Sequence, residues 1–134
     1  MIEALPIEVY RALAFAYSQG FRQYHTIYHA SAVSGMVFHH QRHFKHPKEA
    51  HIAALFHDAF YDVSKQDNEE KSAELALSCI RQWDLQADPL IVEDLILQTK
   101  NHDKDMEFTP DQALFLDCDI HVFADSASTY DVYE

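Results

Sequence analysis

Glycine and proline are scarce in this chain, which has two glycines and four prolines among 134 residues. A sheet of many strands uses both residue types at its turns and bulges, so their scarcity favours long helices. Hydrophobic residues make up 48% of the sequence, which is enough for an ordinary packed core. We therefore expect an all-α fold, a bundle of about six helices, in a single domain that spans residues 1–134.

Basic residues are also few, because ten lysines and arginines stand against 22 acidic residues, for a formal net charge of −12. They are scattered, so neither a nucleic acid polymer nor a membrane surface is an expected partner. No apolar run approaches the length of a membrane span. The two cysteines, Cys79 and Cys118, belong to no paired motif, and the N-terminus lacks the basic region of a secretory signal. We expect reduced thiols and a cytoplasmic protein.

Capping and breaking residues divide the chain into six predicted helices. They are expected from Pro6 until Gly20, from 27 to 44, from 47 to 60, from 68 to 83, from Asp88 onward, and from Thr109 to about 124. In the first helix, apolar residues recur at helical spacing at Ile7, Tyr10, Leu13, Ala14 and Tyr17. The polar segment YDVSKQD, residues 61–67, has no periodicity and is expected to be a loop. The phenylalanines at 15, 38, 56 and 115 are expected in the core.

The segment IAALFHDAF, residues 52–60, places an ionisable pair, His57 and Asp58, in apolar surroundings. Burying an unpaired carboxylate costs several kcal/mol, so such a group is usually neutralised, paired or bound to a metal ion. Taken alone, the pair is also compatible with a hydrogen-bonded helix end that reaches solvent. The choice depends on whether other ligand types occur in similar surroundings.

A second apolar segment, ALFLDCDIHVFA at 113–124, contains two aspartates. Asp117 and Asp119 lie about 200° apart around a helix, so both cannot face one small site. Asp117 precedes His121 by one turn and can pair with it, which leaves Asp119 as the better candidate for the interior. His29, one turn into the second helix, is a further candidate, although a lone histidine at a helix start is more often a capped or core residue.

Five phrases of the sequence together resemble the HD-domain superfamily of metal-dependent phosphohydrolases, in a bacterial branch described only as predicted HD phosphohydrolases. The phrases are RQYHTIYH at 22–29, FHDAFYD at 56–62, NEEKSA at 68–73, QTKNH at 98–102 and LDCDIHVFA at 116–124. The resemblance covers nearly the whole chain. It implies an all-helical bundle in which the metal ligands His29, His57, Asp58 and Asp119 converge on one divalent ion. Such ligands suit manganese, iron, cobalt, nickel or magnesium better than structural zinc.

The implied activity is hydrolysis of a phosphate ester or anhydride of a small phosphorylated molecule, such as a nucleotide, by a metal-activated water. Members of the superfamily that bind two ions look as though they carry extra histidines between the HD pair and the last aspartate. Here only His102 lies in that interval, so the resemblance favours one ion. The alternative is a catalytically silent module with the same fold that binds a metal ion or ligand, or has a regulatory role. A weaker third reading is a helical scaffold whose polar core is only structural.

Further candidate residues come from the same phrases. The candidate catalytic residues are Asp58, Glu69 and His102, and the candidate substrate-binding residues are Arg22, His102 and Lys71. Glu69 would orient the water, with Asp62 as a rival, but an acid in the first turn of a helix is also explained by the helix dipole. His102 would contact a phosphate oxygen or protonate the leaving group. Lys100 is expected to be solvated, within reach of a phosphate at most.

The C-terminal residues depart from the resemblance. Related chains continue through a Tyr-x-x-Tyr phrase into further helices, and Tyr130 and Tyr133 begin this phrase just before residue 134. This ending is compatible with a chain that is cut short. Missing helices would leave apolar surface uncovered, which could drive formation of a homo-oligomer.

Overall fold

The computed structural model describes residues 2–19, 26–62, 64–100 and 107–133, and no strand occurs among them. They form six α-helices and a short 3-10 helix, η1. The elements are α1 (Ile7–Tyr17), α2 (Ile27–His39), η1 (Gln41–His43), α3 (Pro47–Phe56), α4 (Asn68–Gln82), α5 (Pro89–Gln98) and α6 (Pro110–Tyr133). The predicted all-α class with about six helices is confirmed. None of the described helices is both long and apolar enough to cross a membrane.

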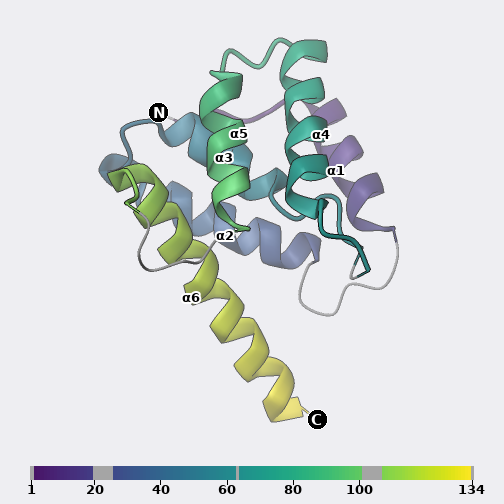
Figure 1. The fold of residues 1–134 in the computed structure, drawn as a ribbon, viewed down its shortest axis with the longest axis vertical. Coiled ribbons are helices and arrows are strands. Elements are labelled where there is room, and N and C mark those ends of the chain that lie inside the picture. Colours follow the sequence, from purple (N-terminus) through teal and green to yellow (C-terminus); the bar gives the residue numbers. More distant parts are fainter. Residues whose placement is uncertain (1, 20–25, 63, 101–106, 134) are drawn as a thin grey trace.

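Helix α3 is the centre of the bundle, because it contacts α2, α4, α5 and α6. Residues 52–56 are all buried, and Phe56 and Phe115 are among the largest side chains that are fully buried. The prediction of a core position is wrong for Phe15 and Phe38, which are 71% and 51% exposed. In Figure 1 the second half of α6 extends away from the other helices, whereas its first half lies against them.

The apolar face of α1 differs from the predicted one. Val9, Leu13 and Tyr17 are buried, whereas Ile7 is 61% exposed and Tyr10 is also exposed. The buried residues follow an i, i+4, i+8 stripe, which lies on one side of a helix. Both stripes share Leu13 and Tyr17, so the choice between them depends on how α1 packs.

Helix α3 ends at Phe56, four residues before the predicted end, because other groups satisfy its last carbonyls. The carbonyl of Ala54 accepts a hydrogen bond from the ring of His57, and the carbonyl of Leu55 accepts one from the hydroxyl of Tyr17, at 2.7 and 2.8 Å. The next backbone bond, from Ala59 N–H to Phe56 O, is of the tighter i to i−3 type. The turn that follows therefore presents His57 and Asp58 at the end of a buried helix.

Two other predicted helix ends are also wrong. Helix α2 ends at His39 instead of residue 44, because the chain tightens into η1 and then becomes extended at Phe44, whose side chain enters the core. Helix α6 continues to Tyr133 instead of about residue 124. Residues 125–133 contain neither glycine nor proline, so no residue of either type interrupts the helix there.

The first turn of α6 is fastened to the rest of the bundle. Thr109 and Gln112 form a reciprocal capping box, in which each side chain accepts a hydrogen bond from the backbone N–H of the other. Both carboxylate oxygens of Asp111 accept backbone N–H groups, from Lys45 at 2.8 Å and from His46 at 2.9 Å. These bonds fix the start of α6 and, through the helix, the position of Asp119.

Candidate metal centre

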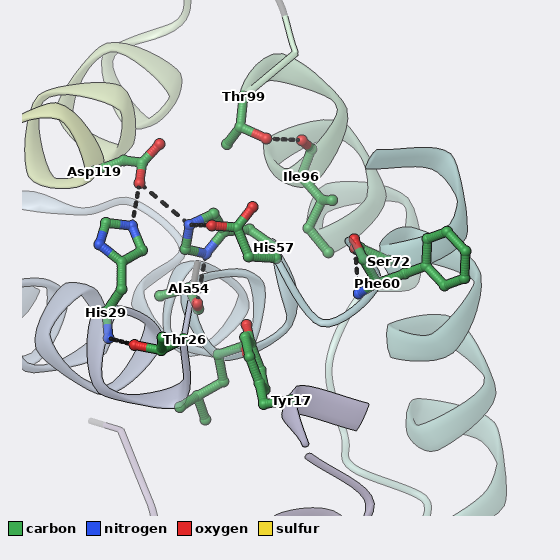
Figure 2. Close-up of polar contacts among 12 residues, drawn as sticks. Tyr17, Thr26, His29, Ala54, His57, Phe60, Ser72, Ile96, Thr99 and Asp119 are labelled. Carbon is green, nitrogen blue, oxygen red and sulfur yellow. Dashed lines mark hydrogen bonds and ion pairs between the residues drawn. The ribbon is translucent and has the colours of Figure 1, made fainter. Parts of the chain in front are cut away.

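Three helices bring three of the four predicted metal ligands, His29, His57 and Asp119, together, whereas Asp58 lies beside His57 but outside this group of mutually close ligand atoms. His29 lies in the first turn of α2, where its backbone N–H donates a hydrogen bond to the hydroxyl of Thr26, the N-cap residue. His57 and Asp58 directly follow α3, and Asp119 lies on α6. Figure 2 shows that the side chains of His29, His57 and Asp119 point toward one another. One potential ligand atom of each lies within 4.8 Å of the other two.

One oxygen of Asp119 contacts both imidazoles. Its Oδ1 lies 2.9 Å from Nε2 of His29 and 3.2 Å from Nε2 of His57. The same Nε2 of His57 lies 3.4 Å from Oδ2 of Asp58. Both histidines are buried, and the two carboxylate side chains are each 15% exposed. We call these four residues, His29, His57, Asp58 and Asp119, the His–Asp cluster.

The imidazole of His57 has a fixed orientation. Its Nδ1 lies 2.7 Å from the carbonyl oxygen of Ala54. A carbonyl oxygen can only accept a hydrogen bond, so Nδ1 carries a proton and donates it. Nε2 is therefore the atom that faces Asp58 and Asp119, and it is the atom that can bind a metal ion once it is deprotonated.

The cluster favours positive charge. Burial by itself would lower the pKa of His57, but the carboxylates of Asp58 and Asp119 and the carbonyl of Ala54 outweigh it and raise this pKa to about 9. Burial would likewise raise the pKa of Asp119, yet its contacts with His29 and His57 hold that pKa well below its usual range. A site that stabilises an imidazolium beside two carboxylates has the electrostatics that a cation requires.

The donor set fits a divalent ion. Ligand atoms bound at about 2.1 Å lie about 3.0 Å apart at right angles and about 3.4 Å apart at tetrahedral angles. The N···O separations within the group His29, His57 and Asp119, 2.9 and 3.2 Å, agree with this range. In addition, the buried Nε2 of His57 has no hydrogen-bond partner among the described residues. When the ring is neutral, no hydrogen-bond donor among those residues occupies the lone pair of this nitrogen.

The His–Asp cluster lines a cavity of about 550 Å³. The remaining lining residues come from the segment before α4, the first turn of α4, the end of α5, and α6; they are Lys65, Gln66, Asn68, Glu69, Thr99, Lys100 and Ile120. Sites for small-molecule ligands have volumes of about 300 to 1,000 Å³. The ligand atoms are therefore next to a space that can receive a small molecule, and are not sealed in a polar core.

A second cavity, of about 590 Å³, lies beside α5 and the first turn of α6 and is mainly apolar. Its most buried polar side chains have structural partners: Asp111 holds the backbone of Lys45 and His46, and Gln112 bonds to Asp94. Among the described residues, this cavity has no group of histidine and carboxylate ligands like the one above. The 550 Å³ cavity is therefore the better candidate for chemistry.

Of the other predicted site residues, some line the cavity and others do not. Glu69 lines the cavity, and its carboxylate makes no hydrogen bond or ion pair with the described residues. Lys71 is exposed and is not part of the described lining. Asp62, the rival of Glu69, accepts hydrogen bonds from Ser64 instead of lining the cavity. The remaining two predicted residues, Arg22 and His102, lie outside the described residues, so their roles stay predictions.

Five lining residues were not singled out as site residues from the sequence: Lys65, Gln66, Asn68, Thr99 and Ile120. The first two belong to the segment interpreted only as a polar loop, and Thr99 follows α5 as an ordinary helix-end residue. The surroundings of Lys65 and Gln66 contain no signal for a site, whereas Thr99 lies within the phrase QTKNH, where only Lys100 and His102 were considered as candidate site residues. Lys100, expected to be solvated, also lines the cavity.

Comparisons with known proteins add no relative. No family model matches this chain, and no curated protein or solved structure shows significant similarity to it. The likeness to the HD-domain superfamily therefore depends on the five sequence phrases, and the functional argument depends on the chemistry of the cavity.

Proposed function

We propose that this protein is a metal-dependent phosphohydrolase of the HD type, which cleaves a phosphate ester or anhydride of a small molecule such as a nucleotide. The observation that carries the proposal is the convergence of four ligand-type side chains, from three positions far apart in the sequence, on one cavity. Buried imidazoles and partly buried carboxylates beside an open space are more consistent with ligand chemistry than with a structural core.

The His–Asp cluster would hold one divalent ion of manganese, iron, cobalt, nickel or magnesium. When bound, such an ion lowers the pKa of a water molecule and withdraws charge from a phosphoryl oxygen. The carbonyl of Ala54 keeps the ring of His57 oriented, and the carboxylates of Asp58 and Asp119 attract the cation. Ser72 holds both the N–H and the carbonyl of Phe60, which supports the turn after His57.

Glu69 is the residue that we assign to proton transfer. Its carboxylate lines the cavity, is partly buried, and makes no hydrogen bond or ion pair with the described residues. An available carboxylate at the edge of a phosphohydrolase site can orient the attacking water and accept its proton. Cys79 and Cys118 are free and buried, so we place the enzyme in the cytoplasm, where thiols stay reduced.

Metal analysis and a phosphatase assay test the proposal. We expect chelator-free protein to retain a stoichiometric divalent ion and to hydrolyse p-nitrophenyl phosphate or a nucleotide in the presence of manganese. His57→Ala should lower the activity by at least about 100-fold. His43→Ala, which changes an exposed histidine of η1, is the matched control and should retain both metal and activity.

Each other outcome selects a different function. Metal binding without turnover in the wild-type protein would favour the catalytically silent module. Absence of a stoichiometric ion would favour the structural scaffold. Equal activity in the wild type and in His57→Ala would contradict the proposed site.

A further inference from the structure

The cavity contains cations as well as carboxylates. Lys65 and Lys100 line it together with Glu69 and the His–Asp cluster. Because the chain has a formal net charge of −12, an anionic ligand gains little from long-range attraction and depends on local cations. The state of each lysine therefore matters.

Lys100 is already engaged. Its Nζ donates hydrogen bonds to the carbonyl of Gln66 and to Oε1 of Glu70, both at 2.7 Å. These bonds join the end of α5 to the segment before α4 and to the first turn of α4. Lys100 therefore braces the cavity wall, and its ammonium is not available without breaking those contacts.

Lys65 is in the opposite state. Its ammonium makes no hydrogen bond or ion pair with the described residues. Only a through-space attraction links it to the carboxylate of Asp62, and that carboxylate accepts both of its hydrogen bonds from Ser64. Among the described lining residues, Lys65 thus carries the positive charge that is available to a ligand.

The backbone that carries Lys65 is nevertheless well held. Its N–H donates to the carbonyl of Asp62 at 3.0 Å. Asn68, at the start of α4, bonds both the N–H and the carbonyl of the same Asp62, each at 3.0 Å. A charge whose backbone is held by hydrogen bonds binds a ligand with a smaller entropy loss than a charge on a flexible backbone.

We propose that Lys65 binds a second anionic group of the substrate, apart from the phosphoryl group at the His–Asp cluster. The inference depends on the proposed function and makes it more specific: the substrate is a small phosphorylated molecule that carries a further phosphate or carboxylate. The cavity volume of about 550 Å³ is consistent with this class, because it is typical of sites for whole small molecules.

Binding of non-hydrolysable phosphonates tests the inference without an activity assay. Calorimetric titrations of manganese-loaded protein would compare alkylphosphonates with phosphonocarboxylates of the same chain length, across a series of increasing lengths. We expect the added carboxylate to strengthen binding at one chain length by about fivefold to tenfold, and this gain to shrink as salt is added. Lys65→Gln should remove the gain and leave the affinity for alkylphosphonates unchanged.

Lys48→Gln is the matched control, because it makes the same change of charge at the opposite end of α3 from His57. It should retain the gain. If no chain length gives a gain, or if Lys65→Gln keeps it, the inference about Lys65 is wrong while the metal site stands. If manganese-loaded wild-type protein binds no alkylphosphonate, or Asp119→Asn binds it equally well, the proposed function fails and the inference fails with it.

Discussion

Replacement of Asp119 by asparagine is the most direct test of the candidate metal centre. Oδ1 of Asp119 contacts Nε2 of both His29 and His57, so this carboxylate joins the two imidazoles of the candidate centre. Asparagine keeps the size of the side chain but removes its charge and one strong ligand oxygen. Asp117→Asn makes the same change on the same helix at an exposed position, which provides a matched control.

The expected size of the effect follows from ligand binding to the folded state. A metal ion present at about 100 times its dissociation constant stabilises the fold by about 2.7 kcal/mol. For 134 residues, the entropy of unfolding is about 0.28 kcal/mol per kelvin, at about 2.1 cal/mol per kelvin and residue. The melting temperature of the wild-type protein should therefore rise by roughly 10 °C.

Differential scanning calorimetry of chelator-treated protein, with and without manganese, measures this shift. The wild type and Asp117→Asn should show the full rise, and Asp119→Asn should show little. Because Asp119→Asn also removes contacts of the metal-free protein, the metal-induced change within each variant is the relevant quantity. A full rise in Asp119→Asn, or a loss of the rise in Asp117→Asn, would refute the assignment of Asp119 as a ligand.

Three further predictions concern stability. Gly35→Ala in α2 should raise the free energy of unfolding by about 0.5 to 1 kcal/mol in urea titrations, because the added methyl group meets no atom within 4 Å; destabilisation would contradict this. Tyr17→Phe should lower the free energy of unfolding by about 1 to 2 kcal/mol in the same assay, since the buried carbonyl of Leu55 loses its hydrogen-bond donor. An unchanged free energy of unfolding would show that this hydrogen bond is dispensable. Burial lowers the pKa of His51 below 6.5, against a weaker opposing effect of the hydrogen bond with the Ser34 backbone. The imidazole of His51 therefore binds a proton more readily in the unfolded chain than in the folded one. The stabilisation from neutral His51 is complete above about pH 6.5 and is lost as the pH falls below that value. The free energy of unfolding of His51→Gln should therefore decrease less than that of the wild type between about pH 7 and pH 5. An unchanged pH profile in this variant would contradict the prediction.

Helix starts were predictable from the sequence because their signals are local. Thr26 caps α2 with its hydroxyl, Asp88 caps α5 with its carboxylate, and Pro110 begins α6, as the sequence indicates. Helix ends were less predictable, because they depend on distant partners. The last turn of α3, for example, is bonded by Tyr17 and the turn after it by Ser72, and neither residue is a neighbour of that segment in the sequence.

In the candidate site, too, positions fixed by local geometry were predictable and positions that depend on distant packing were not. The inward position of Asp119 and the outward position of Asp117 follow from helical geometry and the apolar residues around them, and both positions are observed. The cations of the cavity could not be predicted in this way. Lys65 and Lys71 both lie near the start of α4, and only the path of the preceding turn determines that Lys65 lines the cavity.

The hydrogen bonds between Asp111 and the backbone of Lys45 and His46, at the start of α6, also determine where Asp119 lies in the His–Asp cluster. Asp119 is eight residues beyond Asp111, or about 12 Å along a helix, so a small tilt at the joint with Lys45 and His46 moves the carboxylate without altering any residue of the cavity. An α-helix transmits such a tilt as a rigid rod. The proposed metal centre is therefore sensitive to substitutions at this joint, although neither Asp111 nor its partners Lys45 and His46 line the cavity next to the His–Asp cluster.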